Sequence, residues 1–288
     1  MTLRAAGALR QNDALDRAIV LAECPAPDNL LWQDDHLLLT SGKRVLLLDG
    51  LDQEGAELEE ILHFESEVSA LAAAEDGSLA VALGAAGIVI VGGAHDGKVI
   101  ASLGGKALIA PTALGFAGAD TLFVCLGADL SPGDGWQGTT GSVWRVSLSG
   151  GPSVCLASDL AYPSGLLLHD GRIAVAESGR KRLLDFSTLE RETPRVLLDD
   201  LPGHPGRLSA APGGGAWLAV FAPPSPWRPF GMALGLDRDF APLRALHSRM
   251  DAKRDGVASC LEIRGELIVA CKGGNVVVAA ELAGSSTD

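Results

Sequence analysis

The sequence predicts an all-β protein, a six-bladed β-propeller of four-stranded blades whose last blade is closed by an N-terminal strand. Runs of about four to six apolar residues, rich in Val, Ile and Leu, alternate with tips that contain Gly or Asp, as in strands joined by tight turns. The pattern recurs about every 41 to 51 residues, which is the spacing of propeller blades. Because one such repeat cannot bury both faces of its sheet, we expect six copies to close into a ring.

Each copy consists of an apolar run, a polar or Gly-containing tip, and two further apolar runs separated by a turn. The six copies span residues 29–50, 70–93, 113–148, 165–186, 207–237 and 259–282, with first tips at Asp35, Asp76, Asp120, Asp170, Gly213 and Arg264. The last copy has three evident strands, so "RAIVLAE" (17–23) is predicted as its fourth strand, which would also pair an open sheet edge. Residues 1–16 are expected to form a short helix or a loose arm, and residues 1–288 a single domain.

Composition limits the function. The formal net charge of −13 disfavours nucleic acid and anionic membrane surfaces as partners. No apolar run reaches the roughly 18 to 20 residues that a membrane helix needs, and the N-terminus has no sustained apolar leader, so we expect a cytoplasmic protein. The five cysteines lack metal-ligand spacing and are expected to be buried thiols in a reducing compartment.

A ligand of a propeller usually meets the residues that open each innermost strand around the central channel. A small-molecule ligand is therefore expected at these positions, which hold Asp28, Asn29, Glu67, Pro111, Thr112, Tyr162, Ser164, His204, Arg207, Ala258 and Ser259. Two longer connections, 127–141 with Trp136 and 221–231 with Trp227 and Arg228, could cover an aromatic or cyclic ligand or contact a protein partner. The segment "CKGGN" (271–275) is interpreted as a turn.

Three stretches carry a resemblance to a known family. "YPSGLLLHDGRIAVAESGRKRLLDF" (162–186), "DLPGHPGRLSAAPGGGAWLAVFAP" (200–223) and "GLDRDFAPLRAL" (235–246) resemble the strictosidine synthase-like propellers, which are relatives of the gluconolactonase and senescence-marker-protein lactonases. The similarity covers about residues 107–240. It implies a six-bladed propeller that acts on or binds a small cyclic or ester-type metabolite at the channel mouth.

The resemblance also implies that most of the family's chemical groups are missing. The lactonases hold a divalent cation with carboxylate and amide oxygens, and Asp28 matches one such ligand, whereas Ser164 and Gly206 stand where an asparagine and an aspartate are expected. The glutamate of the synthases falls at about Ala258, and Glu262 is expected near a strand tip instead. Catalytic residues therefore remain unassigned. No cofactor is expected, with Ca²⁺ or another divalent cation at Asp28 as the alternative.

Three alternatives stay open. Ser164, His204 and Asp28 could form a hydrolase triad, or Ser164 could cap a turn while His204 packs under a loop. Arg207 could bind an anionic ligand or form an ion pair with Asp28 or Glu67. The whole protein could be a non-catalytic binding or scaffold propeller that uses its Trp-bearing loops.

Overall fold

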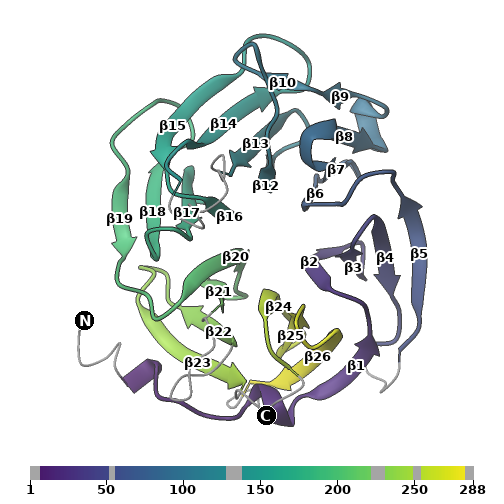
Figure 1. Ribbon diagram of the computed structural model, residues 1–288, viewed down its shortest axis with the longest axis vertical. Coiled ribbons are helices and arrows are strands. Elements are labelled where there is room, and N and C mark those ends of the chain that lie inside the picture. Colours follow the sequence, from purple (N-terminus) through teal and green to yellow (C-terminus); the bar gives the residue numbers. More distant parts are fainter. Residues whose placement is uncertain (1–6, 52–55, 128–137, 222–230, 249–253, 283–288) are drawn as a thin grey trace. The chain divides into compact units, whose positions relative to one another are not determined.

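Six antiparallel four-stranded sheets make up the described part of the computed structural model, which covers residues 7–51, 56–127, 138–221, 231–248 and 254–282. The chain divides into two compact units: unit 1 comprises residues 1–63 and 206–288, and unit 2 comprises residues 64–205. Figure 1 shows the strands of each sheet side by side. That residues 1–288 form one domain stays a prediction.

Unit 1 contains three of the sheets. In the order in which neighbouring strands pair, they are β2 (Pro27–Gln33), β3 (His36–Ser41), β4 (Arg44–Leu48) and β5 (Leu58–His63); β20 (His204–Ala210), β21 (Ala216–Phe221), β22 (Gly231–Leu236) and β23 (Pro242–Ser248); and β24 (Val257–Ile263), β25 (Glu266–Cys271), β26 (Val276–Glu281) and β1 (Ile19–Glu23). Strand β20 begins with the last two residues of unit 2.

Unit 2 contains the other three four-stranded sheets. They are β6 (Ala70–Ala73), β7 (Leu79–Ala82), β8 (Ile88–Val91) and β9 (Val99–Ile100); β12 (Pro111–Ala117), β13 (Thr121–Leu126), β14 (Gly141–Ser147) and β15 (Val154–Leu160); and β16 (Pro163–His169), β17 (Arg172–Glu177), β18 (Arg182–Ser187) and β19 (Arg195–Leu198). A short ribbon pairs β10 (Ser102–Leu103) with β11 (Lys106–Ala107), and short 3-10 turns lie at Gly84–Ala86 and Gly93–His95.

The hairpin tips lie where the sequence predicts them. The tip between β2 and β3 places Asp34 and Asp35 at φ 50° and 62°, and the tip between β16 and β17 places Asp170 and Gly171 at φ 45° and 71°. Asp and Gly tolerate this left-handed backbone better than most residues, which is why they mark the tips. Each tip therefore ends one innermost strand.

The cores lie between neighbouring sheets. We number the sheets in chain order, from the first (β2–β5) and second (β6–β9) to the fifth (β20–β23) and sixth (β24–β26 with β1). In unit 2, one apolar cluster joins the second and third sheets, and another joins the third and fourth. In unit 1, one cluster joins the fifth and sixth sheets, and another joins the sixth and first. The middle strands are buried on both faces and read as continuous apolar runs, such as "IAVA" in β17 and "LIVA" in β25. Burial raises the pKa of Cys271 to about 12 and also raises that of Cys260, so both thiols stay protonated.

The N-terminal strand is confirmed as the fourth strand of the last sheet. β1 pairs antiparallel with β26, with Val20 opposite Val278 and Glu23 opposite Val276. The segment before it is not a loose arm where it is described, because η1 (Leu15–Arg17) buries Leu15 completely in the cluster between the fifth and sixth sheets. No helix in the described ranges has the length and hydropathy to span a bilayer.

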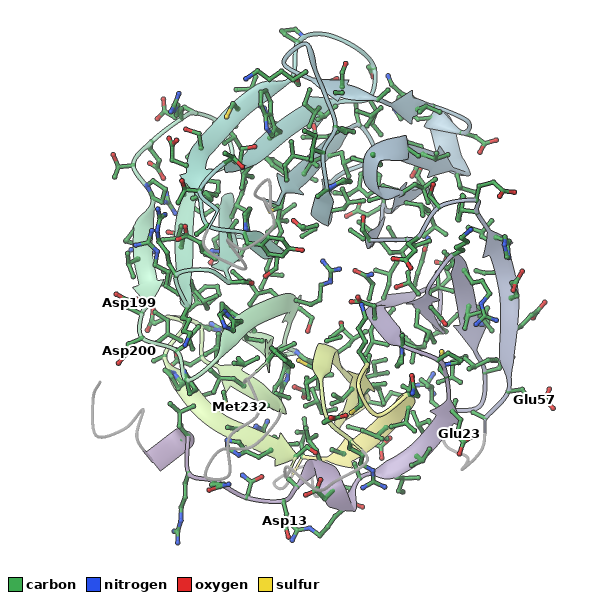
Figure 2. All side chains as sticks on the ribbon, viewed as in Figure 1. Asp13, Glu23, Glu57, Asp199, Asp200 and Met232 are labelled. Atoms are coloured by element: carbon green, nitrogen blue, oxygen red, sulfur yellow. The ribbon has the colours of Figure 1, made fainter. Side chains whose placement is uncertain are left out.

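Acidic side chains gather along outer strands. Figure 2 shows Glu23 at the end of β1 and Glu57 just before β5, and both side chains are exposed. Asp199 and Asp200 follow the outer strand β19 of unit 2 and are exposed.

Candidate functional site

The proposed site residues lie where the innermost strands begin. β2, β12, β16, β20 and β24 start within two residues of Asp28, Thr112, Ser164, His204 and Ala258, as the sequence predicts. Glu67 precedes β6, which starts at Ala70. Asp28, Arg207 and Ala258 belong to unit 1, and Thr112, Ser164 and His204 belong to unit 2.

In unit 1, Asp28 carries two cationic partners. Its Oδ2 lies 2.8 Å from Lys272 Nζ, and its Oδ1 lies 3.6 Å from Arg207 Nε. The side chains of Asp28 and Arg207 are 21% and 18% exposed, whereas that of Lys272 is 52% exposed. Arg207 thus forms an ion pair with Asp28, and whether it also binds an anionic ligand stays a prediction.

Lys272 is held by the turn that follows β25. Its backbone N–H donates to the carbonyl of Gly256 over 2.9 Å. A Cβ on the next residue, Gly273, would lie 2.5 Å from Asp255 Oδ1, so the Asp255 side chain packs closely against this turn. Lys272 extends from the turn to Asp28, near the start of β2.

The residues around Asp28 do not fit a divalent cation. Ca²⁺ needs six to eight oxygen ligands, but Gly206 offers no side chain and Asp28 is already paired with two cations. The described residues contain no cluster of three or more His, Cys, Asp or Glu side chains that could hold a metal ion. A bound cation would also be repelled by Arg207 and Lys272.

Two more candidates in unit 1 connect strands. Asn29 is buried, and its Nδ2 donates to Thr40 Oγ1 over 2.9 Å. Ser259 Oγ accepts the backbone N–H of Leu30 over 3.2 Å, which joins β24 to β2. These bonds give both side chains a structural role.

In unit 2, Ser164 belongs to a hydroxyl cluster. Its Oγ lies 2.5 Å from Ser178 Oγ and donates to the carbonyl of Pro205 over 2.8 Å. Ser178 is 1% exposed and also donates to the Pro205 carbonyl. The two hydroxyls thus join the ends of β16 and β17 to the start of β20.

His204 is oriented by a backbone carbonyl. Its Nδ1 lies 2.9 Å from the carbonyl oxygen of Ser178, and because a carbonyl only accepts, Nδ1 carries the proton. In a hydrolase triad, this nitrogen would donate to a carboxylate and the serine to the histidine. Among the described residues, the printed geometry instead joins Ser164 to Ser178 and Pro205 and His204 to the Ser178 carbonyl, and these contacts favour the structural alternative.

The remaining candidates of unit 2 shape the backbone. The Thr112 hydroxyl is buried and bonds to the carbonyl of Pro163, which joins β12 to β16. Tyr162 has a positive φ of 52°, unusual for an aromatic residue, and its carbonyl accepts the N–H of Ser178. Trp136, Trp227 and Arg228 lie outside the described residues.

Sequence reasoning missed three residues. Lys272 was assigned to a turn, and nothing in "CKGGN" signals that its side chain reaches Asp28. Ser178 and the fully buried Glu177 follow β16 by a hairpin, and Glu177 accepts bonds from Ala161 N, Arg180 Nη1 and Arg182 Nε. Their place at the end of a second strand, next to the start of an inner strand, is a signal that could have found them.

Known proteins resemble this chain in fold, with little identity in sequence. No protein-family model and no curated protein matches the sequence. A gluconolactonase from Xanthomonas campestris matches with a TM-score of 0.69 at 17% identity, over 94% of this chain and 93% of that chain. Regucalcin, a calcium-binding protein from Agrobacterium tumefaciens, matches with a TM-score of 0.65 at 14% identity, over 91% and 92% of the two chains.

A third similar solved structure is a chain of a protein complex. A chain of a nidogen/laminin complex matches with a TM-score of 0.64 at 16% identity, over 86% of this chain and 89% of that chain. Likeness at such low identity concerns architecture rather than activity. Together with the six four-stranded sheets, it shows that the chain has the six-bladed β-propeller fold of gluconolactonase and regucalcin.

Proposed function

We propose that the protein binds a small cyclic or ester-type metabolite that carries a carboxylate, and that it does so without a divalent cation. The ligand would lie at the strand ends marked by Asp28, Arg207 and Lys272. The observation that carries the proposal is the contact of two cationic side chains, those of Arg207 and Lys272, with the single carboxylate of Asp28. An anionic group on the ligand would form charge-assisted hydrogen bonds with these two cations.

The surroundings of Arg207 support the proposal. Its side chain is largely buried, and charge-assisted hydrogen bonds are stronger in such places than on the open surface. The guanidinium plane suits a carboxylate, whereas the more exposed Lys272 supplies a movable ammonium group. Asp28 holds both cations near the strand ends when no ligand is bound.

We propose that the protein binds this metabolite and does not hydrolyse it. Ser164 and His204 make bonds to backbone carbonyls, and these bonds do not activate a serine nucleophile. The metal chemistry of the lactonases is not proposed, because the residues around Asp28 do not fit a divalent cation.

The test is calorimetry on metal-stripped protein with glucuronate, a cyclic sugar acid, and with glucose as its neutral counterpart. We expect glucuronate to bind at least about tenfold more tightly than glucose, and Arg207→Gln to remove that preference. Lys106→Gln, which alters an exposed lysine of unit 2, is the matched control and should bind as the unaltered protein does.

A second arm tests the cation. The protein is titrated with Ca²⁺ and assayed for hydrolysis of a lactone and of an aryl ester. Tight Ca²⁺ binding with ion-dependent turnover, both lost in Asp28→Asn, would show that the proposal is wrong and that a lactonase-type site is present.

The alternative, a binding or scaffold propeller with a protein partner at loops 127–141 and 221–231, is also a proposal. Its support is that the same fold occurs in a chain of the nidogen/laminin complex. Failure of both glucuronate and glucose to bind would favour this alternative.

A further inference from the structure

A pocket of about 380 Å³ lies in unit 2 between the sheet β12–β15 and the sheet β16–β19. His169 and Asp170, at the end of β16, contribute to its lining. Ser164 lies near the start of the same strand, roughly 17 Å away at the rise of about 3.3 Å per residue. The pocket is therefore separate from the candidate site described above.

Arg145 occupies an unusual place in this pocket. On β14 it lies two residues after the fully buried Val143, and it is directly opposite Phe123 of β13. Side chains two apart share a face of a sheet, so Arg145 projects from the face that elsewhere packs as an apolar core. A charged side chain at such a position needs a partner.

The partners of Arg145 do not neutralise it. Its Nη1 donates to the backbone carbonyl of Thr188 over 3.1 Å. Within the described ranges, no carboxylate forms an ion pair with its guanidinium, although the chain has a net charge of −13. A half-buried guanidinium thus faces the pocket with its charge uncompensated.

The other charged groups that line the pocket form ion pairs or are exposed to solvent. Arg172 bonds to Asp185 Oδ2 and Glu192 Oε1, each over 2.7 Å, and these bonds raise its pKa. His169 Nε2 lies 3.2 Å from Asp185 Oδ1, and Asp170 is exposed in the turn at the rim. The remaining half-buried charge is the single positive charge of Arg145.

The pocket also has an apolar wall. Phe123 is 1% exposed, Leu168 is half-buried, and Leu189 is 72% exposed at the rim. A large apolar side chain with that exposure gains stability if a ligand covers it. The volume lies in the usual range for small-molecule pockets.

We propose that this pocket binds a monoanionic carboxylate with an aromatic or short aliphatic body. The carboxylate pairs with the Arg145 guanidinium, and the body packs against Phe123, Leu168 and Leu189. One uncompensated positive charge matches one carboxylate, whereas a phosphate dianion would leave negative charge unpaired in a half-buried place.

The experiment compares two probes of nearly equal shape, 3-phenylpropionate and the neutral 3-phenylpropan-1-ol. Binding is followed by saturation-transfer NMR and calorimetry. We expect the acid to bind at least about tenfold more tightly than the alcohol. Arg145→Gln should remove that difference, and Arg145→Lys should keep part of it because the charge remains.

Three further variants serve as checks on this result. Leu189→Asp changes an exposed side chain, so the fold is retained, and its new carboxylate should repel the acid. Arg244→Gln changes an exposed arginine of unit 1 and is the matched control. Arg207→Gln distinguishes this pocket from the site under "Proposed function", because it removes a cation of that site and leaves Arg145 in place.

Three results would overturn the proposal: equal affinity for acid and alcohol, full binding by Arg145→Gln and Leu189→Asp, or loss of binding in Arg207→Gln alone. The last result would assign the acid to the strand ends of unit 1 instead. Loss in the two pocket variants, with binding kept in Arg244→Gln and Arg207→Gln, supports the pocket.

Discussion

At the scale of single residues, His247 is a neutral histidine inside an apolar sheet. It lies on β23 opposite Met232 and is 3% exposed. Burial lowers its pKa from 6.5 to about 4, and among the described residues its Nδ1 finds no hydrogen-bond partner. The folded protein therefore takes up this proton less readily than the unfolded chain.

We predict that His247 makes the fold sensitive to acid. Between pH 6.5 and 4 the unfolded chain binds the proton and the folded protein does not, so the free energy of unfolding falls as the pH drops. The loss should reach at most about 3 kcal/mol. Denaturant titrations at several pH values should show a shallower slope for His247→Leu than for the unaltered chain. The exposed His36→Gln serves as control, and equal slopes in His247→Leu and the unaltered chain would refute the prediction.

At the scale of elements, the segment before β1 is hydrogen-bonded to β23, the edge strand of the fifth sheet. Asn12 Nδ2 donates to the carbonyl of Ala245 over 2.7 Å, and its Oδ1 accepts the N–H of His247 over 3.0 Å and that of Ala14 over 3.1 Å. Arg254 Nη1 donates to the carbonyl of Leu15 over 3.0 Å. One asparagine thus satisfies backbone groups of β23 that would otherwise form an open edge.

Asn12→Ala should lower the free energy of unfolding by about 2 kcal/mol. It removes four hydrogen bonds, among them a longer one of 3.4 Å to the carbonyl of Arg10, and leaves the N–H of His247 without this partner. Arg17→Ala is the control from the same segment, because it breaks only an exposed ion pair with Asp13 and should cost less than about 0.5 kcal/mol. Chemical denaturation measures both, and equal losses would contradict the role of Asn12.

The order of the strands could be predicted from the sequence, whereas several side-chain contacts between them could not. Strand order and hairpin tips were predictable because apolar runs and Asp or Gly at positive φ leave a local pattern. The contact of Ser164 with the carbonyl of Pro205 was not, since Pro205 lies on β20, in another sheet. The contact of Lys272 with Asp28 joins residues from opposite ends of the chain and leaves no periodic signal.

At the scale of the whole molecule, the sixth sheet contains strands from both ends of the chain. β1 covers the edge of β26, whose sequence "VVVAAE" is apolar and rich in β-branched residues. An uncovered edge of this kind pairs readily with other molecules. Prediction of this closure succeeded because a missing fourth strand and an extra apolar run at the start of the sequence complement each other.

Removal of residues 1–23 should therefore cause self-association. We expect light scattering coupled to size-exclusion chromatography to show a higher mass than for the full chain, with loss of a cooperative thermal transition. Ile19→Thr, which changes an exposed side chain of β1 but keeps the strand, should behave as the full chain does. A shortened protein with unchanged mass and transition would show that β1 is dispensable.

The pairing of β1 with β26 also sets an order of events during translation. The ribosome makes Val20 before its partner Val278, and at about 5 to 20 residues per second the two are separated by roughly 10 to 50 seconds. During that interval β1 has no partner, and an interrupted product never gains one. Leu21 of β1 packs against Val277 and Ala279 of β26, so a chain interrupted before β26 leaves Leu21 without these apolar neighbours.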